Sequence, residues 1–206
     1  MTAEVRPILK IKTMNKYQLR IKSKKALMAY YDQFDFQLSF SGTYRQAIHH
    51  PVCGNYGTKE FLDIEEANRN VQRFLNSASR RIFGCSGAKK GIRLFGIGYI
   101  EGAVRASVHG LPRLHNHMFI GGLDIECIDL LDPEAAYILE QRLLQEWRDS
   151  KWGYDQADIR LIGPRGKKIE LPTIARSRWQ GYIHKQYDPE QSERLIFCLP
   201  NPTEND

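Results

Sequence analysis

The chain has 206 residues, of which 42% are hydrophobic and 26% charged, a composition typical of a soluble globular protein with one sizeable core. Its formal net charge is +6 and its pI is about 9.1, which favours a polyanionic partner. No apolar run is long enough to cross a membrane. The P-loop, G-x-G-x-x-G and G-x-S-x-G motifs are absent, which argues against an ATPase or a dinucleotide enzyme.

The positive charge is concentrated at the N-terminus, where residues 1–25 contain eight basic residues and a single acid, Glu4. Such a block contacts nucleic acid or remains a solvated arm. We expect a basic arm at 1–25 with a short strand at Ile8–Ile11, a folded domain at 26–198, and a flexible tail at 199–206. A short amphipathic helix is predicted for Lys24–Tyr31.

The four cysteines are far apart and form no C-x-x-C motif, and no secretory leader precedes them. We therefore expect reduced thiols in a cytoplasmic protein and no zinc ribbon. The cysteines are Cys53, Cys85, Cys127 and Cys198.

Phe34–Ser41 alternates apolar and polar residues, which predicts a half-buried strand with Phe36, Leu38 and Phe40 on one face. The clearest helix follows at Asp63, whose side chain can cap it. Its apolar stripe consists of Ile64, Ala67, Val71, Phe74, Leu75, Ala78 and Ile82, and Gly84 and Gly87 end it. The helix also carries arginines off the stripe, which we interpret as a solvated face: Arg69, Arg73, Arg80 and Arg81.

A hairpin is predicted next, with one strand at Arg93–Glu101 and the other beginning near His115. His115 and His117 are two residues apart, so their side chains project to the same side of a strand. With Glu101 on the neighbouring strand, these residues form a recognised arrangement for a divalent metal. The alternatives are two surface histidines on an edge strand and a solvated charge at a strand end. His49-His50 is a weaker metal candidate, since adjacent side chains of extended chain point apart.

Asp132-Pro133-Glu134 predicts a helix start, with an apolar stripe that runs to Trp147 and a strand at Tyr154–Ile162 after it. A basic turn at 163–168 and a short strand at Ile169–Leu171 follow. The last predicted helix runs from Pro172 towards Pro189.

Two tyrosines of that last helix lie on different faces. Tyr182 shares a basic face with Arg178 and Lys185, whereas Tyr187 continues an apolar stripe and is interpreted as a packing residue. By itself, Tyr182 could be an ordinary surface hydroxyl.

Together these segments resemble the HUH endonuclease superfamily in its rolling-circle replication initiator (Rep) branch. FQLSFS (36–41) resembles the first family motif, LHNHMFIGG (114–122) the His-hydrophobic-His motif, and YIHK (182–185) the Tyr-x-x-Lys motif. Glu101-Gly102 resembles the acidic residue found upstream of the histidines in many initiators. The similarity covers roughly residues 34–188. One departure is Asn116, where the family has a bulky apolar residue; we expect it to need hydrogen-bond partners.

The resemblance implies an HUH/RRM-like α+β domain with a central, mostly antiparallel sheet of about five strands, the histidine strand near its middle and helices packed on it. It also implies nicking and rejoining of single-stranded DNA at an origin. His115, His117 and Glu101 would hold Mn²⁺ or Mg²⁺, and Tyr182 would form a 5′-phosphotyrosine link with Lys185 beside it. The product would keep a free 3′-hydroxyl that primes synthesis.

The expected partners are single-stranded or hairpin origin DNA of a plasmid or virus, a separate helicase and the host polymerase. Contacts with the DNA backbone are expected from eight cations; the alternative is that several of them only solubilise the protein. They are Lys89, Lys90, Arg105, Arg113, Lys167, Lys168, Arg176 and Arg178. Within the family, a transposase or a relaxase is an alternative. Outside it, the alternatives are a non-catalytic DNA-binding module and a zinc hydrolase, although 206 residues are too few for the barrel hydrolases that use His-x-His.

Overall fold

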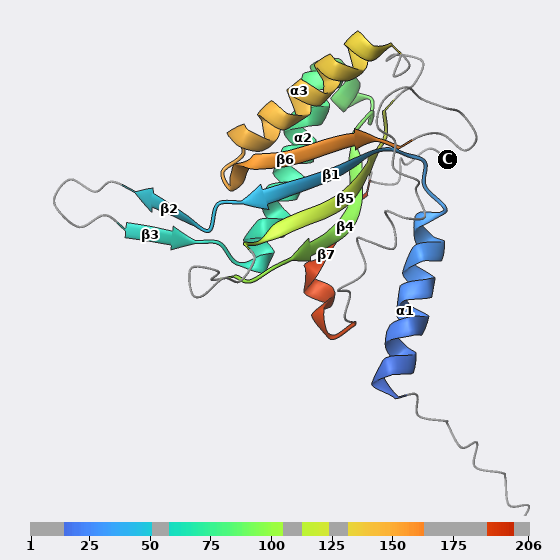
Figure 1. Ribbon diagram of the computed structural model, residues 1–206. Coiled ribbons are helices and arrows are strands. Elements are labelled where there is room, and N and C mark those ends of the chain that lie inside the picture. Colours follow the sequence, from blue (N-terminus) through green and yellow to red (C-terminus); the bar gives the residue numbers. More distant parts are fainter. Residues whose placement is uncertain (1–14, 51–57, 105–112, 124–131, 163–188, 200–206) are drawn as a thin grey trace, which may run out of the picture.

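The structure is a computed structural model that describes residues 15–50, 58–104, 113–123, 132–162 and 189–199. Three helices and a five-stranded sheet make up most of it, and a separate two-stranded hairpin extends from one end (Figure 1). The elements in chain order are α1 (Lys16–Tyr31), β1 (Phe36–Tyr44), β2 (Ala47–His50), β3 (Thr58–Phe61), α2 (Ile64–Lys89), β4 (Phe95–Glu101), β5 (His115–Gly121), α3 (Pro133–Asp149), β6 (Gly153–Leu161), the 3₁₀ helix η1 (Pro189–Arg194) and β7 (Leu195–Cys198). None of the described helices combines the length and the apolar character needed to cross a bilayer.

The main sheet has the strand order β6-β1-β5-β4-β7, and all of these neighbours pair antiparallel. The predicted α+β fold, with a mostly antiparallel sheet of about five strands and helices packed on it, is therefore confirmed. The histidine strand β5 is the central strand, as expected, so the alternative of an edge strand is wrong.

The two faces of the sheet bury different side chains. One face carries Leu38, Phe40, Met118 and Ile120 and packs against α2 and α3, where Trp147 fills the centre. On the opposite face, three aromatic residues of the sheet form a cluster with Tyr31, the last residue of α1. They are Phe36, Tyr99 and Phe119. Because side chains alternate along a strand, β4 and β5 each contribute to both layers.

Helix α2 begins as predicted, because the Asp63 carboxylate accepts a hydrogen bond from the Glu66 backbone N–H at 2.7 Å. The first helical part of α2 ends at Gly84, as predicted, because Gly84 adopts the non-helical angles φ 70° and ψ 174°. Gly87 does not end the element, since a second helical part follows the kink and continues to Lys89. The four arginines lie off the apolar stripe and are exposed, as expected, although Arg81 also pairs with the buried carboxylate of Glu146.

The first helix is longer than predicted. It begins at Lys16 and not at Lys24, because the side chain of Asn15 caps it by accepting from the Gln18 N–H at 2.9 Å. Part of the predicted basic arm is therefore helical. Only the last turns of α1 pack on the sheet, through residues such as Leu27 and Tyr31.

Two features of the sheet differ from the sequence prediction. The pairing of β1 with β5 shifts between Phe36 and Leu38, so Phe36 lies on the opposite face from Leu38 and Phe40. Strand β7, which pairs with β4 at one edge, was not predicted, because its four residues are too short to show a periodic pattern. The predicted strands at Ile8–Ile11 and Ile169–Leu171, the basic turn and the last helix lie outside the described residues.

Candidate metal centre

Three metal-binding side chains meet at one end of the two central strands. Glu101 is the last residue of β4 and pairs directly with His115, the first residue of β5. His117 follows two residues later on the same face, and its backbone pairs with Tyr99 on one side and Ser41 on the other. The register of this antiparallel pair therefore brings together a carboxylate and two imidazoles from two consecutive strands.

The distances are compatible with a single bound ion. The Glu101 Oε2 atom lies 3.4 Å from His115 Nε2 and 3.9 Å from His117 Nε2, and one ligand atom from each residue lies within 4.8 Å of the other two. Ligands about 2.1 Å from one ion are about 3.0 Å apart at right angles and about 3.4 Å apart at a tetrahedral angle. Closing the cluster around an ion therefore needs only a modest movement.

Both imidazole rings are oriented through their other nitrogen. His115 Nδ1 lies 2.9 Å from the Arg113 carbonyl oxygen. Because a carbonyl oxygen can only accept, Nδ1 carries the hydrogen of the neutral ring and Nε2 keeps its lone pair. His117 Nδ1 lies 2.7 Å from Ser41 Oγ, which again directs Nε2 towards Glu101. Partners of this kind fix the tautomer and ring orientation of metal-binding histidines.

The carboxylate itself fits a cation. The side chain of Glu101 is 2% exposed, so the alternative of a solvated strand-end charge is wrong. Among the described residues, no donor reaches its buried Oε1 atom. An ionised carboxylate in this position is costly unless a positive charge balances it, and a divalent ion beside two neutral imidazoles does so.

The centre is open on one side. The His115 side chain is 25% exposed, whereas those of His117 and Glu101 are almost completely covered. Two histidines and one carboxylate leave further coordination positions for solvent or substrate. The described structure thus contains a buried Glu101–His115–His117 cluster that could hold a metal ion with access from the His115 side.

Behind the centre, Asn116 points to the α2 side of the sheet and is completely buried. Its Nδ2 group donates to the Tyr44 hydroxyl at 3.0 Å, and that hydroxyl donates to the Ala67 carbonyl oxygen of α2 at 3.3 Å. Burial raises the pKa of Tyr44, against the opposing effect of the Asn116 hydrogen bond, so the hydroxyl stays protonated. Asn116 thus has a hydrogen-bond partner, as the sequence predicts, at its amide nitrogen, while no described donor reaches its Oδ1.

Of the residues predicted to bind DNA, Arg113 contacts the metal centre through its backbone carbonyl oxygen, 2.9 Å from His115 Nδ1. It is exposed, it precedes His115 by two residues, and its guanidinium group lies 5.2 Å from the centre of the Tyr154 ring. Lys90 is also exposed, but it lies in the turn before β4, at the other end of this strand from Glu101. Lys89 is the last residue of α2, and its side chain is not among those that the structure describes.

The remaining predicted site residues lie outside the described part of the chain. They are the proposed nucleophile and its neighbour, together with five cations: Tyr182, Lys185, Arg105, Lys167, Lys168, Arg176 and Arg178. The weaker candidate His49-His50 belongs to no metal-binding cluster among the described residues; His50 Nε2 lies 3.0 Å from Glu60 Oε2.

Sequence reasoning missed one residue at this centre and the aromatic partner of Arg113. The alternation of Phe34–Ser41 puts Ser41 on the polar face of its strand, and nothing in the sequence aligns it with His117, 76 residues away. The strand pattern that includes Tyr154 likewise does not reveal its contact with Arg113. Only the polar character of the β1 face could have signalled Ser41.

Comparison with protein-family models, with curated protein sequences and with solved structures gave no significant match. The fold and the metal cluster described above are therefore the basis for assigning a function.

Proposed function

We propose that this protein is a metal-dependent endonuclease that nicks and rejoins single-stranded DNA, in the manner of HUH replication initiators. The observation that carries the proposal is the Glu101–His115–His117 cluster on the two adjacent central strands of an antiparallel sheet. The net charge of +6 and the exposed Arg113, whose backbone contacts His115, favour a phosphate-containing substrate.

The donor set supports a divalent ion that tolerates mixed nitrogen and oxygen ligands. Two imidazoles are softer than Mg²⁺ prefers, so we expect Mn²⁺ to bind more tightly in vitro, with Mg²⁺ as the abundant alternative. An ion held there would supply positive charge against a non-bridging oxygen of the scissile phosphate. The chain itself supplies the orientation, through Ser41 for His117 and through the Arg113 carbonyl for His115.

In the proposed reaction, the phenolic oxygen of Tyr182 attacks phosphorus. The new bond joins the tyrosine oxygen to the 5′-phosphate, the bond to the 3′-oxygen breaks, and this oxygen leaves as a hydroxyl after taking a proton. Lys185 stabilises the phenolate and the charge on the phosphoryl group. Because one phosphodiester is exchanged for another, the reverse attack by a 3′-hydroxyl rejoins the strand without ATP.

The test is covalent capture of DNA. The wild-type protein, Tyr182→Phe and Tyr187→Phe are each incubated with a pool of random single-stranded oligonucleotides and Mn²⁺, then separated on a denaturing gel. We expect a slowly migrating protein–DNA band with wild type and Tyr187→Phe and none with Tyr182→Phe. His115→Ala and addition of EDTA should also abolish the band.

The other outcomes point to other functions. If the band persists in Tyr182→Phe and disappears in Tyr187→Phe, the nucleophile is Tyr187 and not Tyr182. The protein would be a DNA-binding module if it bound the oligonucleotides but gave no covalent band at any metal concentration. The same result would be required with the replication origin of the plasmid or virus that encodes it. Strand transfer between two oligonucleotides, without preference for an origin, would favour a transposase or a relaxase.

A further inference from the structure

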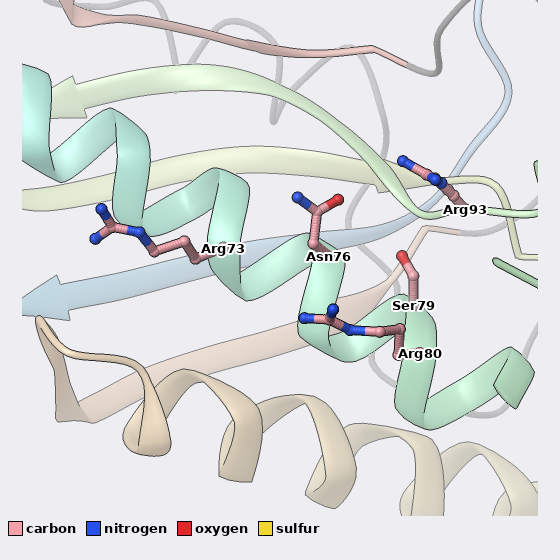
Figure 2. A pocket seen from close by; sticks show the side chains of 5 residues that line it. All are labelled: Arg73, Asn76, Ser79, Arg80 and Arg93. Carbon is pink, nitrogen blue, oxygen red and sulfur yellow. The ribbon is translucent and has the colours of Figure 1, made fainter. Parts of the chain in front are cut away.

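A cluster of positively charged side chains lies on the other side of the sheet from the metal centre. It consists of the side chains of Arg73, Asn76, Ser79, Arg80 and Arg93, which line a cavity of about 260 Å³ (Figure 2). Four of these residues come from α2 and the fifth from the chain just before β4. We refer to this group as the arginine cluster.

The arginine cluster is built by helical spacing. Arg73, Asn76 and Arg80 are three and four residues apart, so they lie along one face of α2, as Figure 2 shows. Arg93 is brought to the same cavity from the segment that enters β4. The apolar stripe of α2 faces the sheet, so these polar side chains face outward over the cavity.

The backbone around Arg93 is closely packed on two sides. The buried Ser79 hydroxyl donates to the Leu75 carbonyl at 2.6 Å and accepts from the Leu94 N–H at 2.9 Å, which joins α2 to the residue after Arg93. Gly122, at φ +85°, lies so close to the Arg93 carbonyl that any Cβ there would collide with it. The backbone at Arg93 is therefore held close to α2, while its exposed side chain extends over the cavity.

The charge of the arginine cluster is largely unbalanced. Arg73 donates to the Glu66 carboxylate at 2.6 Å. In contrast, Arg80 and Arg93 have no ion-pair partner anywhere in the described ranges, and both are exposed. Guanidinium groups in this situation attract anions, and their fork of N–H donors matches the oxygens of a phosphate group.

The size of the cavity limits the ligand. A volume of about 260 Å³ is below the range of about 300–1,000 Å³ that is typical of small-molecule pockets. None of the described residues that line it is aromatic, so they provide no stacking surface for a base. A single phosphodiester group of a passing strand fits these properties better than a free nucleotide.

From these observations we infer that the arginine cluster binds the phosphate backbone of DNA outside the site of reaction. Strand β4 places 7 residues between Arg93 and the end at Glu101, about 23 Å of extended chain. The two sites are therefore at least about seven nucleotides of a stacked strand apart. The cluster therefore holds flanking DNA and not the phosphate at the metal centre. The inference rests on the proposed function only in taking DNA as the partner.

The test is equilibrium binding of a fluorescein-labelled oligothymidylate in EDTA, so that neither metal nor nicking contributes. Arg80→Gln and Arg93→Gln are compared with wild type and with Arg142→Gln, a matched control that removes one exposed arginine from α3. Anisotropy is measured between about 50 and 200 mM salt. Thermal unfolding of each variant confirms that these surface changes leave the fold intact.

We expect each of Arg80→Gln and Arg93→Gln to weaken binding about fivefold and to lower the slope of log affinity against log salt by about 0.7, the value for one single-strand phosphate contact. Arg80→Lys should keep the slope while losing part of the affinity, because lysine keeps the charge without the fork. Arg142→Gln should change neither quantity.

Three results would overturn the inference. If Arg80→Gln and Arg93→Gln behave like Arg142→Gln, the cluster is not a DNA contact, and a covalent DNA band in the nicking assay then leaves the proposed function standing. If ATP, added at constant ionic strength, removes the arginine-dependent part of the affinity, the cluster belongs to free nucleotides. If the wild-type protein binds no DNA, the cluster and the DNA partner are refuted together.

Discussion

Replacing the buried Asn116 with leucine should stabilise the protein. Asn116 donates one hydrogen bond, to the Tyr44 hydroxyl, while its Oδ1 is buried with no described donor. The unsatisfied oxygen costs about 1–3 kcal/mol, and the hydrogen bond returns about 0.5–1.5 kcal/mol. Leucine, which also branches at Cγ, removes both contributions and leaves the Tyr44 hydroxyl donating to Ala67. We expect a gain of about 1 kcal/mol.

For a chain of this length, about 1 kcal/mol raises the melting temperature by about 2–4 °C. The assay is thermal unfolding followed by circular dichroism, with urea unfolding to give the free energy directly. Asn70→Leu is the matched control. Asn70 is equally buried, but both ends of its amide are used, by Ser150 Oγ at 3.0 Å and by the Trp152 N–H at 3.2 Å. The same substitution there should destabilise by about 2 kcal/mol.

A double-mutant cycle sharpens the test. Tyr44→Phe alone leaves the Asn116 amide without its acceptor and should cost about 1–3 kcal/mol. In the Asn116→Leu background it should cost less, since only the 3.3 Å bond to Ala67 is lost. If Asn116→Leu instead lowers the melting temperature as much as Asn70→Leu does, the Asn116–Tyr44 hydrogen bond outweighs the unsatisfied oxygen, and this account of the buried asparagine is refuted.

Two further predictions concern the metal centre and a thiol. Ser41→Ala should weaken Mn²⁺ binding about 10- to 100-fold in calorimetry, because Ser41 orients His117. Ser39→Ala, on the same face of the strand, is the control and should have little effect on Mn²⁺ affinity. Equal losses of affinity in the two variants would contradict the orienting role of Ser41. Burial raises the pKa of Cys198 to about 12, so iodoacetamide at about pH 8 should modify the exposed Cys85 but not Cys198. Peptide mass spectrometry measures the extent of labelling at each cysteine. Equal labelling of Cys85 and Cys198 would contradict the prediction and show that the strand containing Cys198 opens readily.

Much of the metal centre could be predicted from the sequence, because its ligands follow local rules. The i and i+2 spacing of His115 and His117 places them on one face of any strand, and Glu101 ends the strand that precedes them. The start of α2 was predictable for the same reason, since Asp63 and its apolar stripe lie within a few turns of one helix.

The tertiary structure decided what depends on pairing between distant strands. Register sets Ser41 beside His117 and Tyr44 beside Asn116, and the bulge near Phe36 moves that ring to the other face; none of these follows from local periodicity. The arginine cluster likewise exists only because β4 brings Arg93 against α2. Residue type and spacing along the chain determined which side chains could act, and the long-range packing of the sheet decided which of them meet.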